Sequence, residues 1–103
     1  MNARFRFTAE AESQLAEIID YIAADSQEAA RRVLNGVHEA LEKLSEMPEM
    51  GHTREDLTAR PLKFWAVHSY LIVYDPASSP VSVIAILRGA RDVERLLKDR
   101  SQG

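Results

Sequence analysis

The residues best suited to chemistry stand where an apolar run ends, in the segment VIAILRGARD at residues 83–92. The strand-like run is followed at once by Arg88 and Arg91, with Gly89 between them. An arginine side chain presents a planar fork of donors that binds carboxylates in a bidentate manner. Arg88 and Arg91 therefore remain solvated at the end of a strand, pair with Asp92 and Glu94, or present fixed cations to an acidic partner. Gly89 is expected to serve backbone geometry in both cases.

Other familiar catalytic and metal-binding patterns are absent from the sequence. There is no cysteine, which excludes disulfides and thiolate zinc sites and favours a reducing, cytoplasmic compartment. His38, His52 and His68 show no HExxH or other metal-ligand spacing. A Gly-rich phosphate loop and a nucleophile elbow are also missing. We therefore expect neither a metal nor a cofactor.

The elements that position residues 83–92 begin with a short strand predicted at residues 4–8, and two helices are predicted after it. Thr8 can cap a helix over about residues 9–24, and Ser26 can cap a second one that ends at Pro48. The short break between the helices predicts a helical hairpin. Apolar residues recur at helical spacing on one face of each helix: Ala11, Leu15, Ile18, Ile19 and Ile22, then Ala30, Val33, Val37, Leu41 and Leu44.

Three strand-like runs occupy the C-terminal half, at residues 61–67, 69–75 and 81–88. Their short links predict antiparallel pairing. Residues 45–60 lack a period and form an irregular connection, and Asp92 can cap a last helix. The predicted fold class is α+β, with a helical hairpin on a small, mainly antiparallel four-stranded sheet in the order β-α-α-β-β-β-α. At 103 residues the chain is expected to be one domain, residues 1–103.

The middle of this sheet is predicted to be apolar on both faces. Side chains in residues 81–88 are expected to alternate between the two faces of the sheet. Ile84 and Ile86 would then lie on one face, and Val81, Val83, Ala85 and Leu87 on the other. The helical hairpin can cover one face, and a short last helix only part of the other. We therefore expect an exposed apolar patch that marks a partner site.

Charge is unevenly distributed along the chain, whose formal net charge is -3. Residues 1–59 hold twelve acids and six bases, whereas residues 60–103 hold four acids and seven bases. The acidic half either solubilises the helices, or the basic half meets an acidic partner. No signal-peptide core or apolar run of spanning length is visible, so no membrane association is expected.

The segment RPLKFWAVHSYLIVYDPASSPVSVIAILRGARDVERLL resembles the ParE/RelE superfamily of bacterial toxin–antitoxin toxins, and its ParE branch in particular. FTAEAESQLAEIIDYIA is similar to the first helix of that family, and ADSQEAARRVLNGVHEALEKLSEMPEMG to its second helix and exit. The resemblance covers nearly the whole chain. Chains of the ParE branch commonly have a histidine where this sequence has Arg88.

This resemblance implies a small cytoplasmic toxin held inactive in a hetero-oligomer with a co-expressed ParD-like antitoxin. The antitoxin would lay an extended and helical segment over apolar surfaces of the toxin. Toxins of the ParE branch are understood to poison DNA gyrase by binding, whereas those of the RelE branch cut mRNA in the ribosome. A third possibility is a toxin-derived binding module that has lost toxicity.

The residues favour the gyrase poison over the nuclease. Metal-free RNA cleavage needs a proton acceptor, a proton donor and cations around the phosphate. The RelE-like alternative would use Arg60, Lys63, Tyr74, Arg88 and Arg91 as catalytic residues. However, the C-terminal KDRSQG has no aromatic residue or histidine, and the isoelectric point near 5.6 suits a polyanionic target poorly.

Two sets of contact residues follow from this interpretation. The basic strand exit and last helix are the predicted target surface, comprising Arg88, Arg91, Arg95 and Lys98. The apolar sheet face and the helical hairpin are the predicted antitoxin surface, comprising Ile19, Ile22, Trp65, Tyr70, Ile72, Ile84 and Ile86.

Overall fold

A computed structural model describes residues 5–89 of the chain. The elements follow in the order β1 (Phe5–Phe7), α1 (Ala9–Ala23), α2 (Gln27–Glu46), the 3₁₀ helix η1 (Pro48–Met50), β2 (His52–Thr53), β3 (Lys63–Val67), β4 (Tyr70–Asp75) and β5 (Val81–Leu87). The predicted last helix, with Arg91, Arg95 and Lys98, lies outside the described residues. Within residues 5–89, neither helix is long and apolar enough to cross a membrane.

The strands form one mixed sheet in the order β1-β5-β4-β3-β2. β1 pairs with β5 in parallel, and every other neighbouring pair is antiparallel, as predicted for the late strands. The sheet has five strands where the sequence predicted four. The additional strand, β2, pairs only His52 and Thr53 with β3, and two residues are too few to produce a recognisable alternation.

Both helices begin at the predicted caps. The Thr8 hydroxyl accepts a hydrogen bond from the backbone N–H of Ala11 at 3.1 Å, and the Ser26 hydroxyl accepts one from Ala29 at 3.1 Å. Each cap satisfies a backbone donor that the first helical turn leaves without a partner. The two short polar side chains therefore set where the hairpin starts and where it turns.

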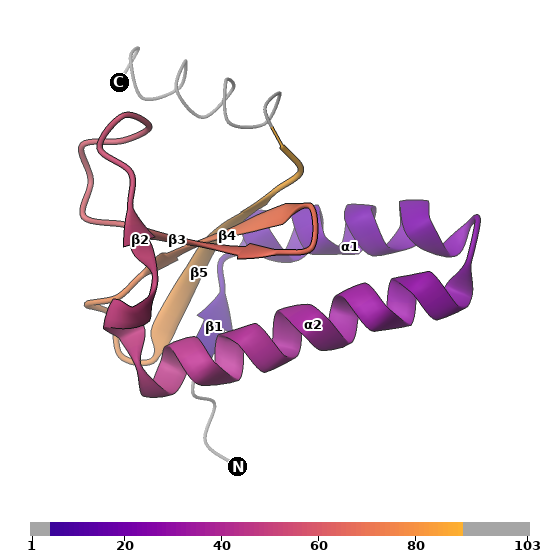
Figure 1. Ribbon diagram of the computed structural model, residues 1–103, viewed down its shortest axis with the longest axis horizontal. Coiled ribbons are helices and arrows are strands. Elements are labelled where there is room, and N and C mark those ends of the chain that lie inside the picture. Colours follow the sequence, from indigo (N-terminus) through magenta and orange to yellow (C-terminus); the bar gives the residue numbers. More distant parts are fainter. Residues whose placement is uncertain (1–4, 90–103) are drawn as a thin grey trace.

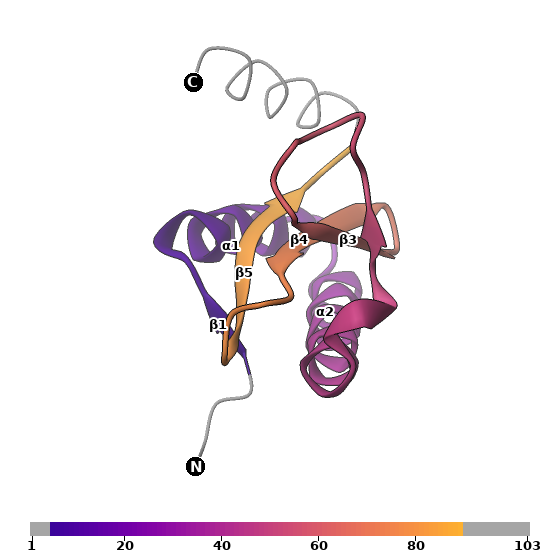
Figure 2. The same ribbon diagram turned by 90° about the vertical axis from the view of Figure 1, so that its left-hand side faces the viewer.

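The hairpin packs on one face of the sheet (Figure 1). α1 lies mainly against β5, and α2 contacts β3 and β1. The core between the layers joins the predicted helical stripes to the inner face of the strands, and includes Ile18, Val37, Leu41, Leu44, Ile72, Tyr74, Val83 and Ile86. Figure 2 shows α1 lying beside β5 while α2 runs below β3 and β4.

The second face of the sheet is covered more fully than the sequence predicted. Leu57 and Leu62, from the irregular segment between β2 and β3, pack with Phe64, Val73, Ala85 and Leu87 as a second buried cluster. Leu71 and Ile84 are half-buried beside it. The expectation of a broad exposed apolar patch on this face is therefore wrong. Leu57 and Leu62 lie in a segment that shows no hydrophobic periodicity, so the sequence did not indicate that they would pack on this face of the sheet.

A β-bulge changes which residues of β5 face the helices. Val73 pairs with Ala85 while Tyr74 pairs with Val83, so Ile84 is an extra residue on β5. Beyond the bulge the alternation is reversed: Val83 and Ile86 face the helices, and Ala85 faces the second cluster. The strict alternation predicted for residues 81–88 is therefore wrong after Val83.

β1 pairs with β5 only as far as Val83. Beyond that residue, Thr8 and α1 bond to the backbone of β5 in place of a neighbouring strand. Beyond β1, the N–H of Thr8 donates to the Val83 carbonyl at 3.0 Å, and the Thr8 hydroxyl donates to the Ile84 carbonyl at 3.2 Å. Further on, the Ile86 N–H donates to Oε1 of Gln14 at 2.8 Å. The Thr8 and Gln14 side chains thus satisfy the Ile84 carbonyl and the Ile86 N–H, backbone groups that a longer β1 would otherwise pair.

Replacing Gln14 tests this arrangement. Gln14→Leu leaves the Ile86 N–H without its acceptor, and we expect the free energy of unfolding to fall by about 1–3 kcal/mol. Gln14→Glu keeps an oxygen at this position and should cost clearly less. Urea unfolding of the two variants beside the original chain measures the difference. Equal losses for the two variants would show that the hydrogen bond is not what matters.

Candidate functional site

The residues proposed for catalysis do not gather at one place. Lys63 pairs with Tyr74 at one end of the β3–β4 ladder, whereas Arg88 follows Leu87, which pairs with Leu71 near the other end. The two ends are four residues apart along β4, or about 13 Å at roughly 3.3 Å per residue. Lys63 and Arg88 therefore start from well separated backbone positions at opposite ends of this ladder.

Tyr74 is buried, and its hydroxyl already has two partners. It donates to the carbonyl of Pro48 at 2.7 Å and accepts from the N–H of Gly51 at 2.9 Å. Burial raises the pKa of the Tyr74 hydroxyl above its ordinary 10.0, the nearby Glu49 charge adds to this, and the Gly51 hydrogen bond opposes it. Because the Tyr74 hydroxyl is buried and already bonded to two backbone groups, it serves the fold and does not fit the role of an exposed proton donor.

Lys63 and Gly51 complete this arrangement, which we call the Tyr74 junction (Pro48, Gly51, Lys63 and Tyr74). The Lys63 ammonium lies 3.4 Å from the Gly51 carbonyl and 3.6 Å from the Glu49 carboxylate. Only 14% of the Lys63 side chain is exposed. A Cβ on Gly51 would collide with the Tyr74 hydroxyl, so this position needs glycine for room. The junction joins η1 and β2 to the middle of the sheet.

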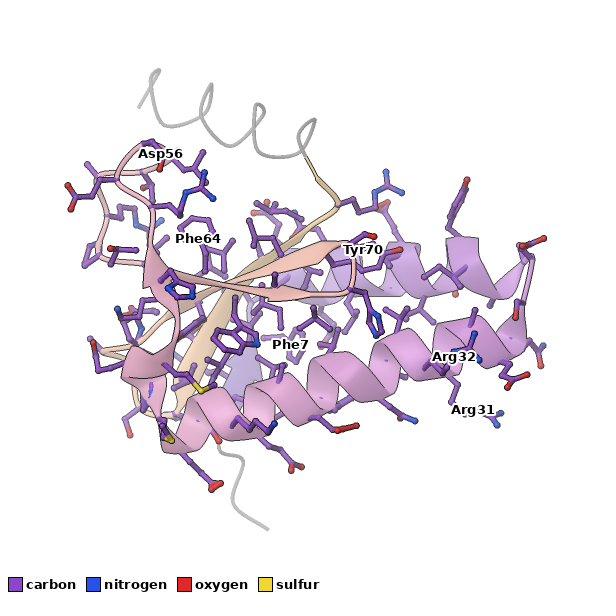
Figure 3. All side chains as sticks on the ribbon, in the orientation of Figure 1. Phe7, Arg31, Arg32, Asp56, Phe64 and Tyr70 are labelled. Atoms are coloured by element: carbon purple, nitrogen blue, oxygen red, sulfur yellow. The ribbon has the colours of Figure 1, made fainter. Side chains whose placement is uncertain are left out.

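The remaining candidate cations lie at the surface. Arg60 is exposed in the segment between β2 and β3, where its backbone N–H donates to the Thr58 hydroxyl at 3.1 Å. Arg88 is exposed directly after β5. Arg31 and Arg32 lie on α2 (Figure 3), where both are exposed and Arg32 pairs with Glu28 at 3.3 Å. Exposed cations of this kind are suited to contact a partner.

The apolar residues predicted to contact an antitoxin fall into two groups. Ile72 and Ile86 are 0% and 1% exposed and lie in the core beneath the helices, so the prediction that they contact a partner directly is wrong for this structure. The bulge turned Ile86 inward, and pairing places Ile72 opposite it. Five others are half-buried and retain some accessible surface: Ile19, Ile22, Trp65, Tyr70 and Ile84.

The structure adds an apolar surface at the tip of the helical hairpin. Tyr21 is 75% exposed, an unusual state for a large aromatic side chain. It borders a shallow, mainly apolar pocket with Ile22, Ala24 and Ala29. The periodicity of α1 left Tyr21 off the buried stripe, and an exposed tyrosine beside a turn was the signal that could have drawn attention to it.

Trp65 and Tyr70 mark two further places on the sheet. The Trp65 ring stacks on His52, with the ring centroids 6.0 Å apart and the planes inclined by 12°. Tyr70 begins β4, after a two-residue turn in which His68 adopts a positive φ of 55°. Figure 3 shows Tyr70 at this end of the β3–β4 hairpin. Both aromatic side chains are partly accessible, Trp65 in the middle of β3 and Tyr70 at the start of β4, opposite Val67.

Taken together, these observations define a small α+β protein whose described residues hold cations and partly exposed apolar groups but no convergent catalytic set. The sequence model of the family described as "ParE toxin of type II toxin-antitoxin system, parDE" matches residues 5–93. The chain therefore belongs to the ParE toxin family, as the resemblance predicted.

A solved structure supports the same fold. A chain described as "Chromosomal ParDE TA system from P. aeruginosa" superposes with a TM-score of 0.66 and 17% sequence identity. The match covers 84% of this chain and 95% of the other. No curated protein matches the sequence.

Removing the Tyr74 hydroxyl tests whether it has a structural role. Tyr74→Phe leaves the Pro48 carbonyl and the Gly51 N–H without their partner, and should lower the free energy of unfolding by about 1–3 kcal/mol. Because the folded pKa lies above 10.0, the folded state holds the Tyr74 proton more tightly than the unfolded chain does. This stabilisation is complete below about pH 10 and is lost as the pH rises through the folded pKa.

Urea unfolding between pH 8 and 11 measures both effects. The original chain should lose stability more steeply than Tyr74→Phe above about pH 10, because only the original chain carries the buried phenol. Tyr21 and Tyr70 are present in both proteins and cancel in the comparison. Parallel curves would contradict the structural role given to the hydroxyl.

Proposed function

We propose that this chain is a cytoplasmic toxin that arrests growth by binding DNA gyrase and is neutralised by a ParD-like antitoxin in a toxin–antitoxin hetero-oligomer. Membership of the ParE family supports the toxin role. The related structure carries the name of a ParDE system, which favours a partner of the ParD type.

One observation favours binding over RNA cleavage. The Tyr74 hydroxyl, the proton donor of a RelE-like mechanism, is occupied by two backbone groups, and the strand register carries Lys63 and Arg88 at opposite ends of the β3–β4 ladder. Metal-free cleavage requires its proton donor and its cations around one phosphate. Binding another protein makes no such demand, because contact residues can be spread over a surface.

The charge distribution is consistent with a protein target. The helical hairpin is strongly acidic, whereas Arg88, Arg91, Arg95 and Lys98 follow β5 in the sequence. Arg88 is exposed at the strand exit. Arginine forks bind carboxylates in a bidentate manner, so this part of the chain is the proposed contact with an acidic surface of the target.

Expression without a partner tests the proposal. We expect the chain to arrest growth and to inhibit gyrase supercoiling while mRNA remains intact in the presence of ribosomes. Arg88→Ala combined with Arg91→Ala should abolish arrest and leave antitoxin binding unchanged, because the target surface loses its cations. Arg60→Ala serves as a matched control that removes an exposed arginine elsewhere, and it should remain toxic.

Each other outcome has a definite meaning. Cleaved mRNA with normal supercoiling would replace the gyrase poison by the ribosome-dependent nuclease. Harmless expression of folded protein would favour a binding module that has lost toxicity. Full toxicity of the double arginine variant would remove Arg88 and Arg91 from the target surface.

The antitoxin surface is proposed on the helical hairpin and on the accessible aromatic residues of the sheet. Ile19 and Ile22 are half-buried on α1, and the exposed Tyr21 extends the same surface to the hairpin tip. Trp65, Tyr70 and Ile84 remain as further candidates from the sheet. Arg31 and Arg32 on α2 suit an antitoxin with an acidic toxin-binding tail.

Tyr21 offers a clean test, because its exposure means that the fold does not depend on it. Tyr21→Ala should weaken antitoxin binding at least about tenfold, which is the effect of losing one aromatic anchor at an interface. Glu17→Ala, at an exposed polar position of the same helix, should change the affinity little. Calorimetric titration with the product of the neighbouring gene measures both. Equal affinities for the two variants would exclude the hairpin tip from the interface.

A further inference from the structure

The helical hairpin is longer than the sheet that it covers. On α1, the Gln14 side chain accepts a hydrogen bond from the N–H of Ile86, the last residue but one of β5. On α2, Gly36 lies against the β3–β4 turn, since a Cβ at this position would be 3.1 Å from Nε2 of His68. Figure 1 shows both helices running on past this turn to the loop that joins them. Within residues 5–89, the sheet-facing side of the hairpin tip is therefore left without a strand.

Tyr21 and Ala29 occupy this uncovered side. Tyr21 follows Gln14 by seven residues and Ala29 precedes Gly36 by seven, which is about two helical turns in each case. Two turns restore the direction of a side chain and move it by about 10 Å along the helix. Tyr21 thus points to the side on which Gln14 holds β5, but it lies beyond the end of that strand. This position explains why 75% of the tyrosine is exposed.

A shallow pocket lies between these two residues. Tyr21 and Ile22 line it from α1, Ala29 lines it from α2, and Ala24 and Asp25 line it from the connecting loop. The two alanines leave room that larger side chains would fill, and the lining is mainly apolar. An apolar side chain from another molecule would remove this lining and the tyrosine ring from water, which favours association.

The charge beside the pocket is negative. Asp25 lines the pocket, and its carboxylate takes part in no hydrogen bond or ion pair with any other described residue. On the same side of α2, Arg32 is already paired with Glu28 at 3.3 Å. Arg31 is two residues from Ala29 and points to the opposite side of the helix. Since α1 contains no lysine or arginine, the pocket presents an unpaired carboxylate to the group that fills it.

We propose that the antitoxin inserts one apolar side chain into this pocket and places a lysine or arginine beside it, against the Asp25 carboxylate. The inference rests on the proposed function, which assigns the hairpin to the antitoxin, and it adds the chemistry that the hairpin tip recognises. The apolar side chain gains contact with Tyr21, Ile22 and Ala29. The cation selects among antitoxins, because a partner without one leaves Asp25 partly desolvated and unpaired. An acidic tail bound by Arg31 would run along the other side of α2.

Filling the pocket tests the apolar contact. Ala29→Leu puts a larger side chain of this chain into the space that the antitoxin would use. Leucine is a good helix former and finds apolar neighbours there, so the melting temperature should not fall. The affinity for the purified product of the neighbouring gene should fall by about tenfold or more in calorimetric titration. Ala16→Leu, the same change at an exposed position of α1 outside the pocket, should leave the affinity unchanged.

Changing the charge of Asp25 tests the cation. Asp25→Asn should weaken binding by about threefold at low salt and make the affinity less dependent on salt, because an exposed ion pair is screened by ions. Asp25→Lys should lose more affinity than Asp25→Asn, because it brings two like charges together. Asp20→Asn removes the same charge from an exposed residue that does not line the pocket, and it should change neither the affinity nor its salt dependence.

The outcomes separate this inference from the proposed function. If the original chain binds the antitoxin and Ala29→Leu binds it equally well, the pocket is not used and the inference alone is overturned. Tighter binding by Asp25→Asn or Asp25→Lys would show an acidic residue of the partner at this place and would likewise overturn it. The Asp25 variants, at an exposed position, decide the matter even if Ala29→Leu disturbs the fold. A folded original chain that does not bind the product at all would overturn the antitoxin of the proposed function, and the inference with it.

Discussion

The Tyr74 hydroxyl is the polar group on which the arrangement of the sheet depends most. A phenol in the middle of a core strand is costly to bury unless its oxygen finds partners, and here the Pro48 carbonyl and the Gly51 N–H serve as partners. Both belong to the connection that follows α2. One hydroxyl therefore ties the connection between α2 and β2 to β4. Lys63 stabilises the same place by neutralising part of the charge of Glu49.

This constraint also bears on function. A tyrosine that holds the fold together is not available to donate protons, and its neighbour Lys63 is engaged at the same junction. Among residues 5–89, the surface carries exposed arginines, a tyrosine at the hairpin tip and half-buried apolar groups, all of which can contact a partner. The molecule carries acidic helices and a basic C-terminal sequence, which suits two different partners on two different surfaces.

The sequence predicted most of the elements because their signals are local. Thr8 and Ser26 cap helices through bonds to residues three positions on, and the buried stripe of α2 repeats at the helical period. The errors arose where distant residues decide the outcome. Ile84 is an extra residue only because of the register in which β5 pairs with β4. Leu57 is buried only because it packs against residues of β3, β4 and β5, which are distant from one another in the sequence. The two-residue β2 exists because the Tyr74 junction holds it beside β3.

The same distinction applies to the site. Exposed cations can be recognised from composition, but whether they converge depends on strand register, which the sequence did not reveal for Lys63 and Arg88. Ile72 and Ile86 could be identified as apolar strand residues, yet the side of the sheet that Ile86 occupies was settled by the bulge at Ile84. Tyr21 was missed although its position off the buried stripe of α1, close to the turn, was visible in the sequence; its exposure came from the structure.

The parallel pairing of β1 with β5 has a consequence for synthesis of the chain. Phe5 meets Val81 across the ladder, so one of the first segments made must wait for one of the last before the sheet can close. Contacts of such long sequence separation form late and slowly in folding. A nascent chain that stops before residue 81 lacks β5, the strand between β1 and β4, and also lacks the arginines that follow it. Interrupted translation of this gene therefore yields a product that can neither complete its sheet nor present its basic end.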